Sequence, residues 1–383
     1  MLFRRPATRI ALSSFQRRLA VGVCAVFAII ALVAGCTQKA TQAWLYQLGT
    51  SQPYFGANEM SLRSVSMVSP DDGWAVGGIS GDPTTLLMQY SRGQWTVLPK
   101  PAGLQDHSDF AAVSMVSHND GWALASMDIP LGDRYNSFRP GSVFLHYDGS
   151  AWRIASPVFP LHAEQTTSAL LMLSSTDGWA TSDNETLRYD GVAWREVTAL
   201  TDKQWGGGSS IAATGPNNVW IARFTGDILH FDGSAWTEQR ITVPFGQQWP
   251  GAILLHGIAM LSPHDGFAVG GIGNSTSGVI VRYLGDRWAV QQTVGENLNG
   301  VTIRSPTDGW AVGGAGGVYH YQAGAWTKAD RPTSLPLYGV DSLHGSGDAW
   351  AVGLDGVILS YHDGGWRQET NVVWSREARA AWK

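Results

Sequence analysis

The chain has 383 residues, of which 15% are charged and 44% hydrophobic, and it contains 46 glycines and 18 tryptophans. This composition excludes a disordered chain and is typical of many short strands joined by tight turns. Without the five arginines of the first 35 residues, 21 basic residues face 31 acidic ones. The resulting net charge of about −10 argues against binding to nucleic acid or to anionic lipid.

The first 35 residues are interpreted as a bacterial lipoprotein signal peptide. Residues 1–18 are basic, and the uncharged apolar run at 19–34 leads into the sequence LVAGC, which ends at Cys36. This sequence resembles the bacterial lipobox. The resemblance implies that Cys36 is acylated and becomes the new N-terminus, and two or three acyl chains give stable anchoring. The alternative is an uncleaved signal anchor in which Cys36 has no role.

Both interpretations place the bulk of the chain outside the cytoplasm, because basic residues stay inside. We therefore expect an extracytoplasmic protein that is lipid-anchored to the bacterial cell membrane. Since the only other cysteine is Cys24 in the leader, a mature chain has no internal disulfide. Residues 36–60 are expected to form an anchor and linker, in which Trp44 marks a candidate closing strand.

Internal repeats dominate residues 61–370. One motif reads like TDGWAVGG, and the other is an aliphatic run followed by a turn and tryptophan, as in FLHYDGSAW. The two motifs alternate strictly, and each occurs seven times. Their aromatic residues are Trp74, Trp122, Trp179, Trp220, Phe267, Trp310 and Trp350 in the first motif, and Trp95, Trp152, Trp194, Trp236, Trp288, Trp326 and Trp366 in the second.

Each repeat supplies four strands, which in the first unit are expected at 62–68, 74–78, 86–90 and from Trp95 onward. The Asp-Gly of the first motif predicts a hairpin turn, because both central residues of such a turn favour positive φ. Repeats of about 40 residues with four strands are typical of propeller blades. We therefore predict an all-β fold, a seven-bladed β-propeller of four-stranded antiparallel blades over residues 61–370.

The motif aromatics are interpreted as the packing between blades, where large rings fill the space between twisted sheets and small Ala and Gly let the sheets approach. The alternative is that they form sugar-binding platforms. The C-terminal tail, residues 371–383, contains Trp374 and Trp382 and fits no repeat.

The repeats resemble the BNR/Asp-box group and the repeats of photosystem II assembly factor propellers, in which a Gly-Trp-Ala-Val-Gly strand leads to an Asp-Gly turn and a tryptophan. One departure is that Asp148 and Gly149 are adjacent, whereas the Asp-box has one residue between Asp and Gly. The Gly-Gly pairs at 77–78, 270–271 and 313–314 also resemble kelch repeats. Every one of these resemblances implies a propeller, and a fold alone does not carry a function over.

The connections between strands indicate which face of the propeller carries function. The turns between the first and second strands, and between the third and fourth, are all expected to be short and to lie on one face. Long connections lie on the other face, at 126–142, 155–167, 199–209 and 241–257. Long loops on a rigid scaffold usually carry function. We therefore expect the working face there, weighted toward blades 2 to 5.

These loops hold aromatic and charged residues that the repeat does not explain, and exposed Trp, Tyr and Arg are typical interface anchors. The alternative is that they cover the cores of their own loops. The candidate partner-binding residues are Asp133, Arg134, Tyr135, Phe138, Arg139, His162, Lys203, Trp205 and Trp249.

No catalytic residue, metal site or cofactor is predicted. The arginine triad and tyrosine nucleophile of sialidases, which share Asp-box propellers, have no counterpart on these strands. His146, His230 and His320 occupy the same strand position in three blades, so radial symmetry keeps them beyond the ~2 Å bonds that a shared metal needs. The aspartates of the Asp-Gly turns are interpreted as turn formers rather than calcium ligands.

We therefore expect a non-enzymatic binding or assembly propeller, a monomer whose partner is a protein or a cell-wall glycan. One alternative is an extracytoplasmic hydrolase or lyase acting on carbohydrate, with carboxylates such as Asp128, Asp133 or Glu164 over the channel. The other is a structural envelope protein.

Overall fold

The computed structural model describes residues 60–79, 85–105, 108–130, 138–155, 159–160, 169–181, 186–197, 208–242, 253–273 and 275–381. All of them belong to one compact unit, Phe55–Lys383. The signal peptide, Cys36 and the candidate closing strand within 36–60 lie outside the described residues. Among the described residues, no helix has the length and apolar character that crossing a membrane requires.

The described strands group into antiparallel units of four consecutive strands, here called blades. The first four blades are β1 (Met60–Ser69), β2 (Asp72–Ile79), β3 (Thr85–Ser91) and β4 (Gln94–Val97); β5 (Phe110–Ser117), β6 (Asp120–Pro130), β7 (Phe138–Tyr147) and β8 (Trp152–Ile154); β10 (Ala169–Ser174), β11 (Asp177–Thr181), β12 (Thr186–Tyr189) and β13 (Trp194–Glu196); and β14 (Gly208–Gly215), β15 (Asn218–Arg223), β16 (Asp227–Phe231) and β17 (Trp236–Thr242).

Three further blades follow in the same pattern. They are β18 (Ile253–Ser262), β19 (Asp265–Ile272), β20 (Gly278–Tyr283) and β21 (Trp288–Val294); β22 (Leu298–Ser305), β23 (Asp308–Gly313), β24 (Val318–Gln322) and β25 (Ala325–Lys328), with the 3-10 turn η1 (Gly314–Gly316); and β26 (Leu337–Ser342), β27 (Ala349–Gly353), β28 (Ile358–His362) and β29 (Gly365–Gln368). The expected strands of the first unit match β1 to β4 to within two residues.

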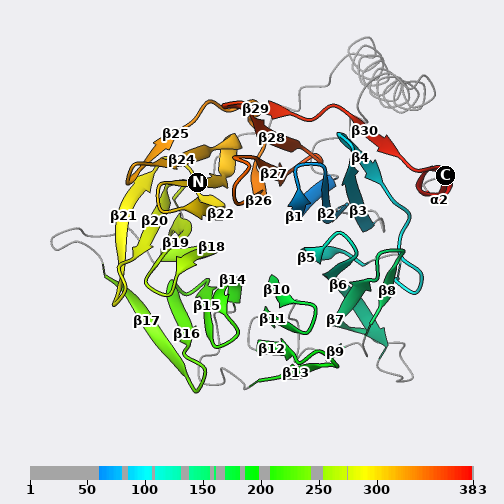
Figure 1. Cartoon of the computed structure of the whole chain (residues 1–383), viewed down its shortest axis with the longest axis horizontal. Coiled ribbons are helices and arrows are strands. Elements are labelled where there is room, and N and C mark those ends of the chain that lie inside the picture. Colours follow the sequence, from blue (N-terminus) through cyan, green and yellow to red (C-terminus); the bar gives the residue numbers. More distant parts are fainter. Residues whose placement is uncertain are drawn as a thin grey trace, which may run out of the picture. The chain divides into compact units, whose positions relative to one another are not determined.

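The blades stand in a circle with their first strands innermost (Figure 1). Adjacent inner strands are in contact in the order β1, β5, β10, β14, β18, β22 and β26, and β26 in turn contacts β1. The prediction of an all-β propeller built from four-stranded antiparallel blades is therefore confirmed.

The motif aromatics meet at the seams between blades. Trp74 of blade 1 lies edge-on to Trp152 of blade 2, with ring centroids 5.2 Å apart and planes at 85°. The same edge-to-face contact joins Trp310 of blade 6 to Trp366 of blade 7, at 5.0 Å and 85°. Such geometry is favourable because it places a positive ring edge on a negative ring face. Twelve of the fourteen motif aromatics are buried, whereas Trp236 and Trp366 are half-buried.

The Asp-Gly of the first motif is not a hairpin turn, which corrects one expectation. In blade 1 the turn residues are Pro70 and Asp71, and Gly73 lies inside β2. A Cβ on Gly73 would sit 2.3 Å from the Met67 sulfur of the paired strand. Gly73 therefore makes room for Met67. The positive φ that is expected in a tight hairpin turn occurs instead at the turn of the second motif, as at Gly149 (φ 84°).

Polar side chains link the inner strands, between which the described residues form no backbone ladder. The Ser66 hydroxyl of β1 accepts the backbone N–H of Met115 in β5, at 3.0 Å. At the closing seam, the Asp341 carboxylate of β26 accepts the backbone N–H of Met67 in β1, at 2.7 Å. The first and last blades are therefore joined by the same kind of bond as neighbours in sequence.

The C-terminal tail supplies the outermost strand of blade 1. Strand β30 (Val372–Trp374) runs parallel to β4, and the Trp95 N–H donates to the Asn371 carbonyl at 3.0 Å. Trp374 is 7% exposed, and the short helix α2 (Arg376–Ala381) follows it. The segment without a repeat thus fastens the end of the chain to its first blade (Figure 1).

Two blades are also joined at their outer edges. Strand β17 pairs in parallel with β21, with Ile241 opposite Trp288, so that blades 4 and 5 form one eight-stranded sheet. The Trp288 indole N–H donates to the Gln239 side chain at 2.9 Å.

Candidate functional site

Most of the predicted partner-binding residues lie outside the described residues. This holds for Asp133, Arg134, Tyr135, His162, Lys203, Trp205 and Trp249. Phe138 and Arg139 belong to β7, but only their backbone is described.

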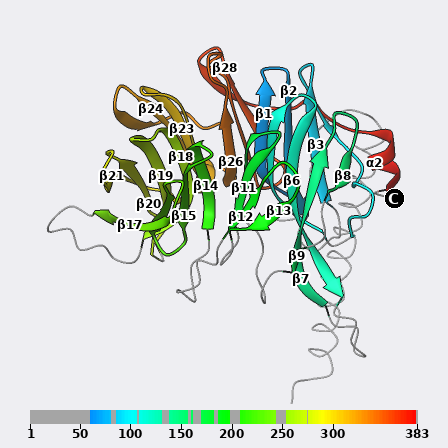
Figure 2. The same cartoon turned by 60° about the horizontal axis from the view of Figure 1, so that its bottom comes forward.

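The predicted loop 126–142 is partly strand, which is a second correction. The ladder between β6 and β7 continues to the pair Pro130 and Phe138. The short strand β9 (Phe159–Pro160), within the predicted loop 155–167, pairs with β7 near Gly141. Figure 2 shows this hairpin reaching further than the strands of the other blades. Exposed Asp128 belongs to the extension, where its backbone N–H donates to the Gln105 side chain at 2.8 Å.

The predicted long-loop face contains a pocket of about 600 Å³ at the centre of the ring, here called the axial mouth. It is formed where the inner strands begin, so six blades contribute to it. Its lining residues are Ser61, Arg63, Asp109, Ala111, Ser126, Ser209, Phe224, His256, Asn299 and Tyr338.

An ion pair joins blades 1 and 2 at the axial mouth. Arg63 Nη2 of β1 lies 2.5 Å from Asp109 Oδ2, just before β5. Burial raises the pKa of Asp109, and the nearby Arg63 guanidinium opposes that rise. Asp109 Oδ1 is buried and has no hydrogen-bond partner among the described residues. This oxygen faces β2, since a Cβ on Gly78 would lie 2.1 Å from it. The pair thus offers the Arg63 guanidinium to the mouth.

A neutral histidine lines the opposite side of the ring. Burial lowers the pKa of His256. Its Nδ1 lies 2.8 Å from the Leu298 carbonyl oxygen of the next blade. Because a carbonyl can only accept, Nδ1 carries the proton, and Nε2 of the neutral ring is left as an acceptor.

Phe224 is the exposed apolar residue of the axial mouth. It is 44% exposed, and its ring centroid lies 5.6 Å from that of His256. The turn that carries it is fixed by a buried ion pair, in which Arg223 Nη1 lies 3.0 Å from Asp227 Oδ2. Gly226 in this turn has φ 81°, and a Cβ there would meet the Ile253 carbonyl oxygen at 2.3 Å. Phe224 is therefore held rigidly at the rim.

The recurrent histidines of the third strands are bound within their own blades. His146, His230 and His320 each lie within 2.8 Å of a side-chain oxygen at the start of the preceding strand, from Asp120, Asn218 and Asp308. Each imidazole also packs on the tryptophan of that strand, most closely at His320 and Trp310, with centroids 3.8 Å apart and planes at 4°. They therefore belong to the packing of the blades.

Arg63, Asp109 and His256 were not predicted from the sequence because they lie near the starts of inner strands, outside both motifs. Arg63, Asp109 and His256 come from three different blades, and only ring closure brings them together. The chain does contain one signal. Arg223, the last residue of β15, and Phe224 stand where blades 1, 5 and 6 have Gly-Gly.

No family model matches the sequence, and no match was found among curated proteins. Solved structures match most of the chain. YCF48 bound to a D1 peptide superposes with a TM-score of 0.56 at 15% identity, covering 82% of this chain and 95% of that one. YCF48 from Cyanidioschyzon merolae gives 0.55 at 14% identity, covering 80% and 97%. The WD40 propeller domain of Doa1 gives 0.54 at 13% identity, covering 81% and 95%.

The chain has the fold of a β-propeller. At these identities the likeness concerns the fold alone. The resemblance of the repeats to photosystem II assembly factor propellers thus holds at the level of the fold, and the assignment to the BNR/Asp-box group remains a prediction.

Proposed function

We propose that this propeller is a non-enzymatic binding or assembly protein that holds a protein partner at its axial mouth. The observation that carries the proposal is Phe224, a half-exposed aromatic ring on a rigid turn beside polar groups from other blades. Aromatic anchors surrounded by polar groups carry most of the binding energy at protein interfaces. Because the turn is already ordered, a partner would lose little entropy in ordering it.

The solved neighbours agree with this kind of role. One of them is described as bound to a D1 peptide, and that description concerns the neighbour. For the present chain, Arg63 and His256 Nε2 offer a donor and an acceptor to a peptide backbone or to polar side chains. We propose that the flanking loops, with Trp205 and Trp249, extend this surface.

The proposed address is the outer surface of the bacterial cell membrane, with a lipid on Cys36. This rests on the apolar run at 19–34 and the sequence LVAGC at 32–36. In cells fed a labelled fatty acid, the unmodified chain should incorporate the label and lose its first 35 residues, as mass spectrometry of the purified protein would show. Replacement of Cys36 by serine should abolish the label and leave the leader attached. If the unmodified chain carries no label and keeps its leader, it is held by an uncleaved signal anchor instead.

Site-specific photocrosslinking on intact cells tests the binding proposal. A photoreactive phenylalanine analogue replaces Phe224 in one full-length variant and Leu284 in another. Leu284 is a matched control, because it is 49% exposed and lies in a turn on the opposite face. We expect a discrete cross-linked protein from position 224 that is absent from position 284.

The cross-link from position 224 should also weaken when Asp109→Ala is added, since that change removes the carboxylate of the mouth. Equal products from both positions, or none from position 224, would show that the axial mouth does not bind a protein. A cross-link from position 284 alone would place the partner on the short-turn face.

A further inference from the structure

A pocket lies on the opposite, short-turn face, where two departures from the repeat meet. The first departure is Arg304. The register of the inner strands places it one residue after the position of Met67, Ile303 and their equivalents. The residues at this position in the seven blades are Val68, Val116, Leu173, Thr214, Leu261, Arg304 and Leu343. Arginine is the one charged residue in this set.

The second departure is the turn that faces Arg304 from blade 7. From Met67 to Asp72 in blade 1 there are five positions, and the same spacing recurs in the next five blades. In blade 7 the spacing from Ser342 to Asp348 is six positions, so this turn is one residue longer than expected from the sequence. Two of its residues, Gly345 and Gly347, have positive φ of 89° and 87°.

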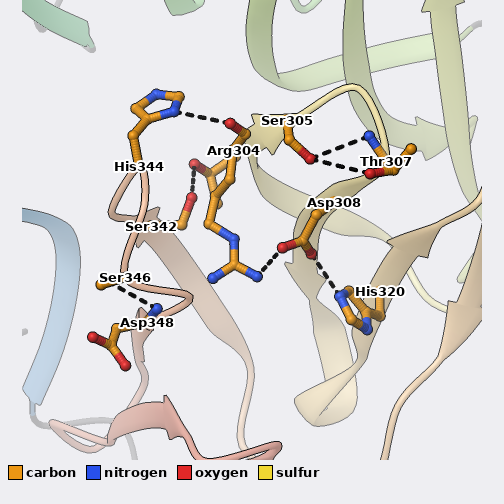
Figure 3. A network of polar contacts seen from close by, with 10 residues as sticks. Arg304, Ser305, Thr307, Asp308, His320, Ser342, His344, Ser346 and Asp348 are labelled. Carbon is orange, nitrogen blue, oxygen red and sulfur yellow. Dashed lines mark hydrogen bonds and ion pairs between the residues drawn. The ribbon is translucent and has the colours of Figure 1, made fainter.

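Arg304 is buried and only partly paired. Its side chain is 7% exposed, and Nη2 donates to the Asp308 carboxylate, which also binds His320 Nε2 at 2.7 Å. The Nε and Nη1 atoms are buried and have no hydrogen-bond partner among the described residues. Figure 3 shows the guanidinium between Asp308 and the blade 7 turn. A buried donor without a partner is costly, so a ligand oxygen that reached Nε or Nη1 would form a favourable hydrogen bond.

Arg304 lines a pocket of about 560 Å³ between blades 6 and 7. Blade 7 contributes Asp348, Tyr361 and Asp363, and blade 6 contributes Asp308 and His320. The turn covers Arg304 closely, since a Cβ on Gly347 would lie 3.7 Å from Nη1. Access to Nη1 therefore requires the turn to shift outward.

The donors and acceptors of the pocket select the class of ligand. Nε and Nη1 lie on different edges of the planar guanidinium, so one carboxylate cannot bridge them as it bridges a fork. Three aspartates around the pocket also repel an anion. Asp348 Oδ1 already lies 2.7 Å from His362 Nδ1. A well-matched ligand therefore offers separate neutral oxygens to Arg304 and hydrogen-bond donors to Asp363 and to the second oxygen of Asp348. A hydroxyl group does both, because it is a donor and an acceptor at once.

We propose that this pocket, here called the blade 6/7 site, binds a neutral saccharide through its hydroxyl groups. Arg304 donates to two sugar oxygens, Asp348 and Asp363 accept from sugar hydroxyls, and Tyr361 covers part of the sugar ring. The site is separate from the axial mouth, so this proposal does not depend on the proposed protein partner.

Saturation-transfer difference NMR on the full-length chain tests the proposal. The probes are the methyl glycosides of glucose, galactose, mannose and N-acetylglucosamine, with sodium acetate and lysine amide as an anion and a cation. We expect at least one glycoside to bind, and neither acetate nor lysine amide to compete with it. Arg304→Leu should weaken that binding by about tenfold or more, since a hydrogen bond to a charged group contributes about 1.5–3 kcal/mol.

Arg304→Leu should not disturb folding, because it introduces a residue type that other blades have at this position. Two further variants separate a binding effect from a folding defect. The first, Arg287→Leu, is a matched surface control on the same face. Arg287→Leu should bind like the unmodified chain. Deletion of Ser346, which restores the five-position spacing, should weaken binding as Arg304→Leu does. Binding of no glycoside, equal binding by Arg304→Leu, or preferential binding of acetate or lysine amide would each overturn the proposal.

Discussion

Trp350 in the last blade packs against Tyr90 in the first, with ring centroids 6.3 Å apart and planes inclined at 61°. Trp220 and Tyr283 make the same contact between blades 4 and 5, at 6.3 Å and 61°. The seam that closes the ring therefore has the same aromatic packing as an internal seam. The closing seam differs in two features: the carboxylate of Asp341 bonds its inner strands, and β30 is added to the outer edge of blade 1.

The added strand should contribute measurably to stability. Trp374→Ala removes a side chain that is 7% exposed, and we expect it to lower the free energy of unfolding by about 3 kcal/mol, as for other buried tryptophans. Asn371→Ala, which removes two exposed side-chain hydrogen bonds just before the same strand, should cost about 1 kcal/mol or less. Urea denaturation measures both. Equal losses would mean that the indole does not anchor β30.

The acid at the closing seam should make stability depend on pH. Burial raises the pKa of Asp341 to about 6, against the opposing bonds from the Met67 and Ser342 N–H groups. The folded state then binds an extra proton between the unfolded pKa near 4 and this value, so stability falls as pH rises through that window, by up to about 3 kcal/mol.

Asp341→Asn cannot ionise, and it gives up one of the two N–H bonds. We expect it to be less stable than the unmodified chain at pH 4, with the difference shrinking or reversing by pH 7. Ser114→Ala removes another bond between inner strands without removing a titrating group, so its deficit should stay constant with pH. A constant deficit for Asp341→Asn as well would show that this carboxyl has no raised pKa.

A large residue faces a small one across the first two strands of each of two blades, but the large residue is on the first strand in blade 3 and on the second in blade 4. This difference predicts that substitutions at the two paired positions are energetically coupled. Met172 faces Gly178 in blade 3, whereas the equivalent pair in blade 4 is Ala213 and Val219. Gly178→Val alone should destabilise by about 1–3 kcal/mol through overpacking. Met172→Ala alone should cost about 2–5 kcal/mol through a cavity.

The double substitution should cost less than the sum of the two, by about 1–2 kcal/mol, because the valine fills the space that the methionine leaves. Gly178→Val combined with Met260→Ala in blade 5 is the matched control and should be additive. If the neighbouring pair were also additive, the two positions would not share one space.

The fold could be predicted from the sequence because the two motifs alternate at a regular spacing along the chain. Trp74 and Trp95, with their six equivalents each, set the strand order, and the strand bounds follow from the apolar runs beside them. The role of Gly73 was misread because its environment, the Met67 sulfur, belongs to a strand paired across the turn. The local sequence favoured a turn at Gly73, but packing against Met67 places this glycine inside β2.

The candidate sites were harder to predict, because they consist of residues that differ from the repeat. Arg63, Asp109 and His256 carry no motif, and their proximity depends on closure of the ring. Arg304 could have been found from the sequence alone, by aligning the seven units and looking for a charge where the others have an aliphatic residue or threonine. The predicted loop residues remain predictions.

The pairing of β30 with β4 has a consequence for the making of the protein. Blade 1 is synthesised before the segment that covers its outer edge, so the edge of β4 stays open until residues 372–374 have been made. An incomplete chain would therefore present an uncovered strand, which favours association with other chains. Loss of residues 372–383 would thus expose the outer edge of β4 in the first blade.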